Sequence, residues 1–195
     1  MKFIKIILFS LLGILFIFLI SNLFFSKNFK LSTNIEINSS PLIVYEQINN
    51  FKNWANWDPW LEADTTITFK ISSVSFDVGA ERTWNSKNSG KGKIEIIKNN
   101  FLKNIDFKIS LENNNPFMAT FILEPSKNNV RLTWENRGEL PYLSRIFGPV
   151  IGKMMKDDHR KGLENLKDYC ESIPSKSSDV EIKEWGSQNI ILIKD

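Results

Sequence analysis

A succession of six strand-like segments, followed by one long amphipathic helix, constrains the fold of this chain more than any other feature. Polar turn-forming residues, such as Ser89-Gly90 and the asparagines at 113–115, separate these segments. Consecutive hairpins of this kind predict an antiparallel meander. The strand-like segments lie at 66–75, 80–86, 92–99, 102–111, 116–125 and 129–139.

The final helix is predicted to start at Pro149 and to end near Ile173-Pro174, because proline fits a first helical turn but not a helix interior. Apolar residues recur every three or four positions and predict one buried side, while charged residues occupy the other. Cys170, the only cysteine, is expected to be a packed thiol. The residues expected on the inner side are Phe147, Ile151, Met154, Met155, Gly162, Leu166 and Tyr169.

One strand and two short helices precede the meander. Residues 31–37 alternate as a half-buried strand, and Pro41 suits the start of the first helix. The second helix passes through Trp54 and is expected to end near Asp58-Pro59. This order predicts an α+β helix-grip fold, in which a curved antiparallel sheet of about seven strands wraps around the C-terminal helix and can enclose an apolar cavity.

The segment Lys2 to Phe25 is predicted to be an uncleaved transmembrane anchor. Residues 6–25 contain only three polar side chains, and about twenty helical residues span a bilayer core of about 30 Å. A cleaved signal peptide and a buried soluble helix are the alternatives, but the bulky residues 23–25 do not suit a signal-peptidase site. The slight bias of lysines predicts a single-pass protein with a cytoplasmic N-terminus and an extracytoplasmic domain.

Charge excludes one class of partner. The chain has 25 Lys and Arg against 22 Asp and Glu, but residues 1–30 hold four of the basic residues and no acidic one. The soluble part is therefore neutral, and we expect no nucleic-acid partner. We divide the chain into an anchor at 1–27, one domain at 28–173, and a linker and tail at 174–195 that contains one or two strands.

Three stretches carry a resemblance to a known family. They are Asn38-Ser39-Ser40-Pro41, the tryptophan-rich segment 54–60, and the closing part from Gly138 to Lys167. The chain from about 30 to 173 resembles a membrane-anchored bacterial subgroup of the SRPBCC superfamily, which includes polyketide cyclases/dehydrases, START-like lipid-transfer proteins and the birch-pollen allergen. The resemblance implies the helix-grip fold. Residues 179–195 resemble the first strand of a gyrase-inhibitor-like effector-binding domain, either truncated here or unrelated.

Large aromatic and sulfur-containing residues are the candidates for a ligand site. Trp54, Trp57 and Trp60 can form a rim at a cavity mouth, or they can simply pack beneath the short helices. The remaining candidates can line a cavity for an apolar ligand or fill the same space. The full set is Trp57, Trp60, Trp84, Phe107, Phe121, Trp134, Phe147, Ile151, Met154 and Met155.

Candidates for catalysis are few. His159 is the only histidine, so mechanisms that need two imidazoles are excluded. A proton-transfer role would fall to His159, Asp158 or Arg82, with Glu135 also in range. A helical wheel separates Asp158 and His159 by about 100°, and the ordinary interpretation is a partly exposed boundary histidine. No metal-ligand spacing or phosphate loop is present, and we expect no metal and no cofactor.

Three functions remain open. The first is a membrane-anchored domain that binds an apolar small molecule or lipid and needs no catalytic residue. The second is a cyclase or dehydratase that uses His159, Asp158 or Arg82 within the same cavity. The third is a structural or sensory domain with a filled core. Ligand identity and oligomeric state do not follow from the sequence.

Overall fold

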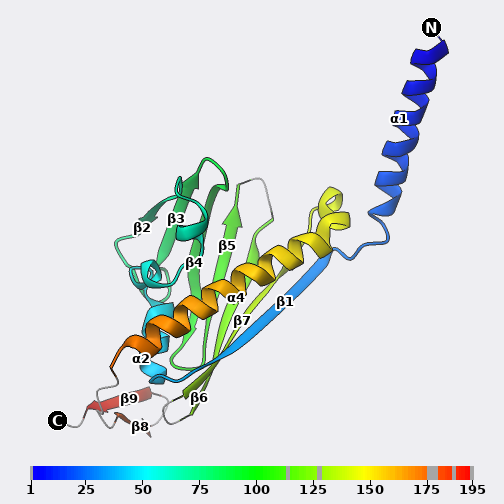
Figure 1. Cartoon of the computed structure of the whole chain (residues 1–195). Coiled ribbons are helices and arrows are strands. Elements are labelled where there is room, and N and C mark those ends of the chain that lie inside the picture. The colour runs from blue at the N-terminus through cyan, green and yellow to red at the C-terminus, as the bar shows by residue number, and fades with distance from the viewer. Residues whose placement is uncertain (1, 113–114, 127–128, 175–179, 186–187, 194–195) are drawn as a thin grey trace.

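A curved seven-stranded antiparallel sheet forms the body of the domain (Figure 1). The structure is a computed structural model that describes residues 2–112, 115–126, 129–174, 180–185 and 188–193. The strand order is β1-β7-β6-β5-β4-β3-β2, so the first strand closes the meander beside the last. The strands are β1 Asn28–Ile37, β2 Thr68–Ile71, β3 Glu81–Ser86, β4 Gly90–Asn100, β5 Asn104–Leu111, β6 Phe117–Ser126 and β7 Asn129–Glu139.

One long helix, α4 (Gly148–Ser172), runs across the concave face of this sheet (Figure 1). It follows the 3-10 helix η2 (Tyr142–Phe147) and packs against β1. The predicted helix-grip architecture is therefore confirmed. Cys170 is buried without a disulfide partner, and burial raises the pKa of its thiol to about 12, as expected of a packed and unreactive cysteine.

Two turns of the meander differ from the prediction. The turn expected at residues 99–100 lies instead at 101–103, because β4 continues to Asn100 and Leu102 takes the left-handed conformation, with φ 56°. The strand predicted at 66–75 is only four residues long. Ser72 explains its early end, because its hydroxyl accepts a hydrogen bond from the Glu81 N–H at 2.9 Å and diverts the chain from regular pairing.

Short helices close one end of the sheet. They are α2 (Pro41–Asn49), the 3-10 helix η1 (Asn53–Asn56) and α3 (Trp60–Ala63). The sequence did not predict α3: Pro59 precedes its first turn, where the missing N–H is not needed, and the Asp58 Oδ1 accepts a hydrogen bond from the Trp60 N–H at 3.0 Å. The segment after η1 therefore turns back over the sheet.

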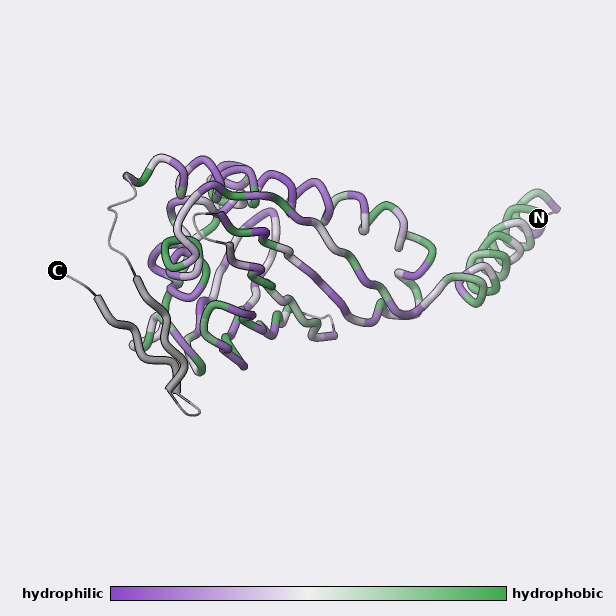
Figure 2. The backbone as a smooth tube through the Cα atoms, turned by 90° about the horizontal axis from the view of Figure 1, so that it is seen from below, coloured by the Kyte–Doolittle hydropathy of each residue, from purple (hydrophilic) through white to green (hydrophobic). Residues whose placement is uncertain are grey.

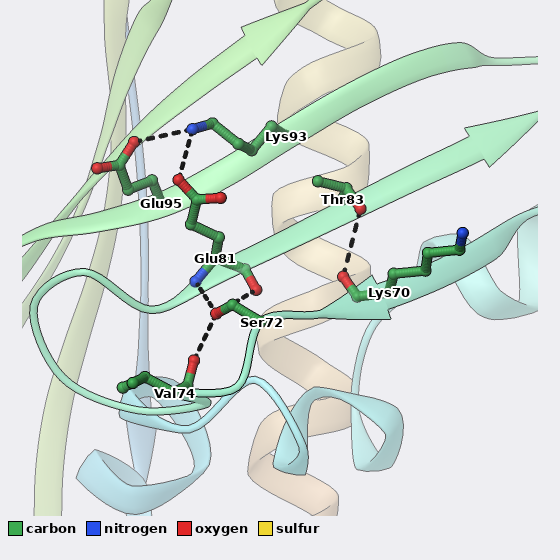
Figure 3. A network of polar contacts seen from close by, with 7 residues as sticks. All are labelled: Lys70, Ser72, Val74, Glu81, Thr83, Lys93 and Glu95. Atoms are coloured by element: carbon green, nitrogen blue, oxygen red, sulfur yellow. Dashed lines mark hydrogen bonds and ion pairs between the residues drawn. The ribbon is translucent and has the colours of Figure 1, made fainter.

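The convex face of the sheet is polar. Figure 3 shows Lys93 between two carboxylates, at 2.6 Å from Glu81 and 3.2 Å from Glu95. These residues lie on β3 and β4 and alternate with inward-facing Arg82, Trp84 and Ile94, in the period of two that a half-solvated sheet requires. Because of this alternation, the opposite, concave face of the sheet carries the side chains that point into the interior.

The N-terminal helix α1 (Lys2–Ser21) stands away from the domain and is hydrophobic along its length (Figure 2). Among the described residues it is the one helix that is long and apolar enough to cross a membrane. Its C-terminal end contacts η2, where the Asn22 Oδ1 accepts a hydrogen bond from the Ile146 N–H at 3.1 Å and Phe18 lies 6.4 Å from Phe147. In the tail, β8 (Val180–Trp185) and β9 (Gln188–Ile193) form a separate two-stranded antiparallel sheet.

Candidate functional site: a cavity under the long helix

A cavity of about 440 Å³ lies between the concave face of the sheet and α4. The side chains around it are mostly apolar and come from β1 to β7, η1, α3 and α4 and their connections. The core is therefore not completely filled, whereas the sequence alone was compatible with either a cavity or a filled core. Among the described residues, no group of three or more His, Cys, Asp or Glu side chains is placed to hold a metal ion.

Large aromatic side chains form the walls of the cavity. Trp84 lies flat over Gly92 on the neighbouring strand, where a Cβ would come within 2.1 Å of its Cζ2 atom. Trp134 likewise uses the space above Gly162 of α4, where a Cβ would lie 3.0 Å from Cζ3. Both glycines are thus required for these indoles to reach the interior. Trp54, whose Nε1–H donates to the Ile48 carbonyl, also lines the cavity.

The predicted ligand-site residues fall into three groups: those that line the cavity, those that are buried outside it and those that are exposed. The cavity-lining group consists of Trp60, Trp84, Phe121, Trp134, Ile151 and Met155. Trp57 and Phe107 are buried but do not line the cavity: Trp57 donates from Nε1 to the Gln47 carbonyl at 3.2 Å and packs against Trp54. For Trp57 the core-packing interpretation is therefore confirmed.

Two of the predicted inner residues face outward. Phe147 is 53% exposed and Met154 is 64% exposed, so their expected place on the inner side of the long helix is wrong. The reason is that Ile151 and Met155 take the cavity-facing positions at this end of α4. The apolar spacing in the sequence includes the exposed pair, Phe147 and Met154, as well as the cavity-facing pair. One helix face cannot bury all four side chains.

The cavity extends to one end of the sheet. In the strand register, Asn28 pairs with Glu139 and Ile109 pairs with Phe117, so these strand ends lie together. The segment that follows Glu139 passes Leu140, Pro141 and Ser144 along the edge of the cavity before α4 begins. This is the end at which η2 contacts the C-terminal end of α1 (Figure 1).

A buried ion pair lies at the inner part of the cavity. The Arg82 guanidinium is 2.5 Å from the Asp58 carboxylate, and both side chains are buried. The guanidinium also stacks 3.6 Å from the centroid of Phe69. Burial lowers the pKa of Arg82, and the neighbouring Asp58 charge opposes that shift. Arg82 is therefore charged and already paired, which holds the η1–α3 segment against β3.

His159 is the most unusual polar group of the cavity wall. It is 1% exposed, which corrects the interpretation of a partly exposed boundary residue. Its ring stacks on the indole of Trp134, with centroids 4.1 Å apart and 10° between the planes. Neither ring nitrogen has a hydrogen-bond partner among the residues that the structure describes. Burial lowers the pKa of His159 to about 4, so the imidazole is neutral at pH 7.

Asp158, the neighbouring residue on α4, also lines the cavity but is only partly buried. Burial raises the pKa of its carboxyl, while a hydrogen bond from the side chain of Trp60 opposes the shift. All three catalytic candidates of the sequence therefore border one cavity. Glu135, in contrast, forms an ion pair with Lys30 at 3.0 Å and does not line it.

We predict that His159 makes folding stability depend on pH. The folded-state pKa, about 4, is below the ordinary value of 6.5, so the unfolded chain binds the proton first as pH falls. The stability is complete above about pH 6.5 and declines toward pH 4, by about 3 kcal/mol. Urea unfolding measured over this range checks the prediction.

The matched variant for this measurement is His159→Phe, which keeps a flat ring against Trp134 without an ionisable group. Asp158 titrates in the opposite sense because its pKa is raised, so the difference between the wild-type and variant curves isolates the histidine. Identical pH slopes in both chains would contradict the prediction.

Several cavity residues were missed by sequence reasoning. Ala119 and Asn136 line the cavity from β6 and β7, and their signal was the parity of the strands, since each stands two residues from a recognised inner aromatic. Asp58, which pairs with the cavity residue Arg82 but does not itself line the cavity, had no such signal, because Arg82 lies 24 positions away in the sequence.

Comparisons with known proteins agree with the geometry. Residues 28–171 match the family model described as polyketide cyclase / dehydrase and lipid transport. A search of curated proteins found no significant match.

Solved structures with the same fold include three proteins at low sequence identity. Protein CV1439 from Chromobacterium violaceum has a TM-score of 0.56 at 14% identity, over 74% of this chain and 98% of its own. The Aha1 dimer from Colwellia psychrerythraea has a TM-score of 0.54 at 18% identity, over 74% and 97%. DynU16, from the dynemicin biosynthetic locus, has a TM-score of 0.53 at 12% identity, over 82% of this chain and 64% of its own. These likenesses show the fold.

Proposed function

We propose that this chain, which belongs to the polyketide cyclase/dehydrase and lipid transport family of the SRPBCC superfamily, is a membrane-anchored domain that binds an apolar small molecule or a lipid. The single observation that carries the proposal is the apolar cavity of about 440 Å³ beneath α4. Ligand sites in proteins are typically preformed, mostly apolar cavities of about 300–1,000 Å³ with a few polar groups. This cavity has a volume in that range, a mostly apolar wall and a few polar groups.

The α1 helix supports the membrane part of the proposal. Its twenty residues correspond to about 30 Å of helix, the thickness of a bilayer core. Four exposed apolar side chains of η2 and α4 lie at the end of the domain that contacts α1: Leu143 (55%), Phe147 (53%), Val150 (61%) and Met154 (64%). An exposed apolar group of this kind is typical of a surface that meets a membrane or a partner.

The anchor contacts η2, and the residues around the start of η2 line one end of the cavity. Because the tether keeps the domain at the membrane surface, a ligand dissolved in the bilayer would meet this end of the cavity at a high effective concentration. We further propose the N-terminus-in orientation, with the domain outside the cytoplasm, on the slight excess of positive charge at the N-terminal end of α1, where Lys2, Lys5 and the terminal amine lie.

The proposal is tested on the full chain in bacterial membranes. We expect the intact chain, including residues 1–27, to stay in the membrane after a carbonate wash and its domain to be cleaved by protease added outside. After purification in mild detergent, native mass spectrometry and organic extraction are expected to find one apolar molecule per domain. Release by carbonate would contradict anchoring, and an empty chain that also binds no apolar probe would contradict ligand binding.

An enzyme of the cyclase or dehydratase type is the second candidate. The observation that favours it is the position of Arg82, Asp158 and His159 on the wall of one cavity. We prefer a binding function to an enzymatic one for two reasons. Arg82 is already paired with Asp58, and a histidine with a pKa of about 4 is a weak base at neutral pH. Turnover of a bound polyketide-like substrate that is lost in His159→Phe would reverse this preference.

A further inference from the structure

The unpaired imidazole of His159 points to the chemistry of the ligand. Buried polar groups in proteins nearly always have hydrogen-bond partners, and those without one need an explanation. Within the part of the chain that the structure describes, both ring nitrogens of His159 lack a partner, although the ring stacks on Trp134 at 4.1 Å. The side chain is 1% exposed and lines the cavity, so a molecule held in the cavity is the candidate partner for a ring nitrogen.

His159 lies deep in the cavity. Ile151, which lines the outer part of the cavity beside η2, precedes it by eight residues, or about 12 Å along α4. The side chains around the intervening space are mostly apolar, including Phe117, Phe121 and Met155. A molecule that extends from this end of the cavity to the imidazole therefore has an apolar body of about this length.

The charges nearby decide which polar group fits. Arg82 is neutralised by Asp58 at 2.5 Å, and Asp158 adds an acidic group on the same wall. His159 itself is neutral at pH 7, since burial lowers its pKa to about 4. Among the described residues, the inner part of the cavity thus has no unpaired cation for a carboxylate or phosphate. A neutral imidazole has one N–H donor and one acceptor, and a hydroxyl group can complement either nitrogen.

We propose that the ligand of the proposed binding function, on which this step rests, is an uncharged alcohol or phenol with an apolar body, and that its hydroxyl group lies inward and hydrogen-bonds to a ring nitrogen of His159. The hydroxyl satisfies the buried imidazole, and the apolar body fills the space between the sheet and α4. Ionised fatty acids and other anions are disfavoured because their charge would be buried without a counter-ion.

Three probes with the same ring system test the proposal: pyrene, 1-hydroxypyrene and 1-pyrenecarboxylate. The full chain is placed in phosphatidylcholine nanodiscs, and energy transfer from its tryptophans reports binding. Four of these tryptophans line the cavity: Trp54, Trp60, Trp84 and Trp134. Energy transfer to probe that is merely dissolved in the bilayer rises linearly with probe concentration, and this contribution is subtracted. We expect 1-hydroxypyrene to bind about three- to tenfold more tightly than pyrene, the worth of one neutral hydrogen bond, and the carboxylate to bind most weakly.

His159→Phe keeps the stacked ring and removes both nitrogens, so it is expected to bind pyrene and 1-hydroxypyrene equally. His159→Gln restores a donor and an acceptor and is expected to recover part of the preference. Equal binding of the two probes by the wild-type chain, a preference that survives in His159→Phe, or tightest binding of the carboxylate overturns the proposal while leaving the binding function intact. No saturable binding of any probe overturns both.

Discussion

Replacing Asp58 by asparagine is expected to lower the free energy of unfolding by about 3–5 kcal/mol, because the change leaves the buried Arg82 guanidinium without its counter-charge. The asparagine still offers Oδ1 to the Trp60 N–H, so the start of α3 keeps its hydrogen bond and the effect reports the charge alone. For a chain of this size the loss corresponds to about 6–20 °C in melting temperature. Thermal unfolding of the full chain in mild detergent, followed by circular dichroism, checks the value.

The double variant Asp58→Asn/Arg82→Met is the matched control. Replacing both partners of a buried ion pair by uncharged groups is often nearly neutral, so the second change is expected to restore most of the lost stability. A single variant within about 1 kcal/mol of the wild-type chain would mean that Arg82 finds water or another partner. The ion pair would then not fix the η1–α3 segment to β3.

Replacing Ala119 by tryptophan is expected to weaken the binding of an apolar probe at least about tenfold. Ala119 is buried on β6 and lines the cavity, so a large side chain there occupies the space of the ligand. Because tryptophan is the largest side chain, expelling it from the cavity would cost about 1.4–3 kcal/mol of packing strain, which corresponds to about ten- to 150-fold in affinity. Pyrene titration of the full chain in nanodiscs measures the change.

Thr120→Trp is the control for this variant. Thr120 is the next residue on β6 and lies on the opposite face of the sheet, outside the cavity. The two variants therefore have the same number of tryptophans, and both add one to β6. They differ only in the face of the sheet from which the new side chain projects. We expect Thr120→Trp to bind pyrene as the wild-type chain does. Equal weakening in both variants would mean that the probe binds elsewhere or that the sheet is disturbed.

The sequence predicts the fold well because local patterns fix it. Turn residues such as Ser89-Gly90 divide the meander, and the strands between them alternate between the polar convex face and the cavity. The order of elements then leaves α4 to cover the concave face, since α1, the other long helix of the described residues, precedes the sheet and stands away from the domain. The sheet order, with β1 beside β7, agrees with this reasoning.

The candidate site is less predictable because it depends on contacts between distant segments. The helical spacing of α4 identifies an apolar stripe, but it does not tell which part of the stripe meets the sheet. Phe147 and Met154 are consequently exposed, whereas His159 is buried against Trp134. The pairing of Asp58 with Arg82 is equally non-local, and a cavity differs from a filled core only by the summed volumes of many side chains.

The titration of the full chain with pyrene tests most directly whether the domain is a hollow binding domain. We predict tryptophan-to-pyrene transfer that saturates at one probe per chain in the wild-type chain and in Thr120→Trp, and saturable transfer that is at least about tenfold weaker in Ala119→Trp. Transfer that rises linearly with probe in all three chains, or that saturates equally in all three, would contradict a ligand site beneath α4.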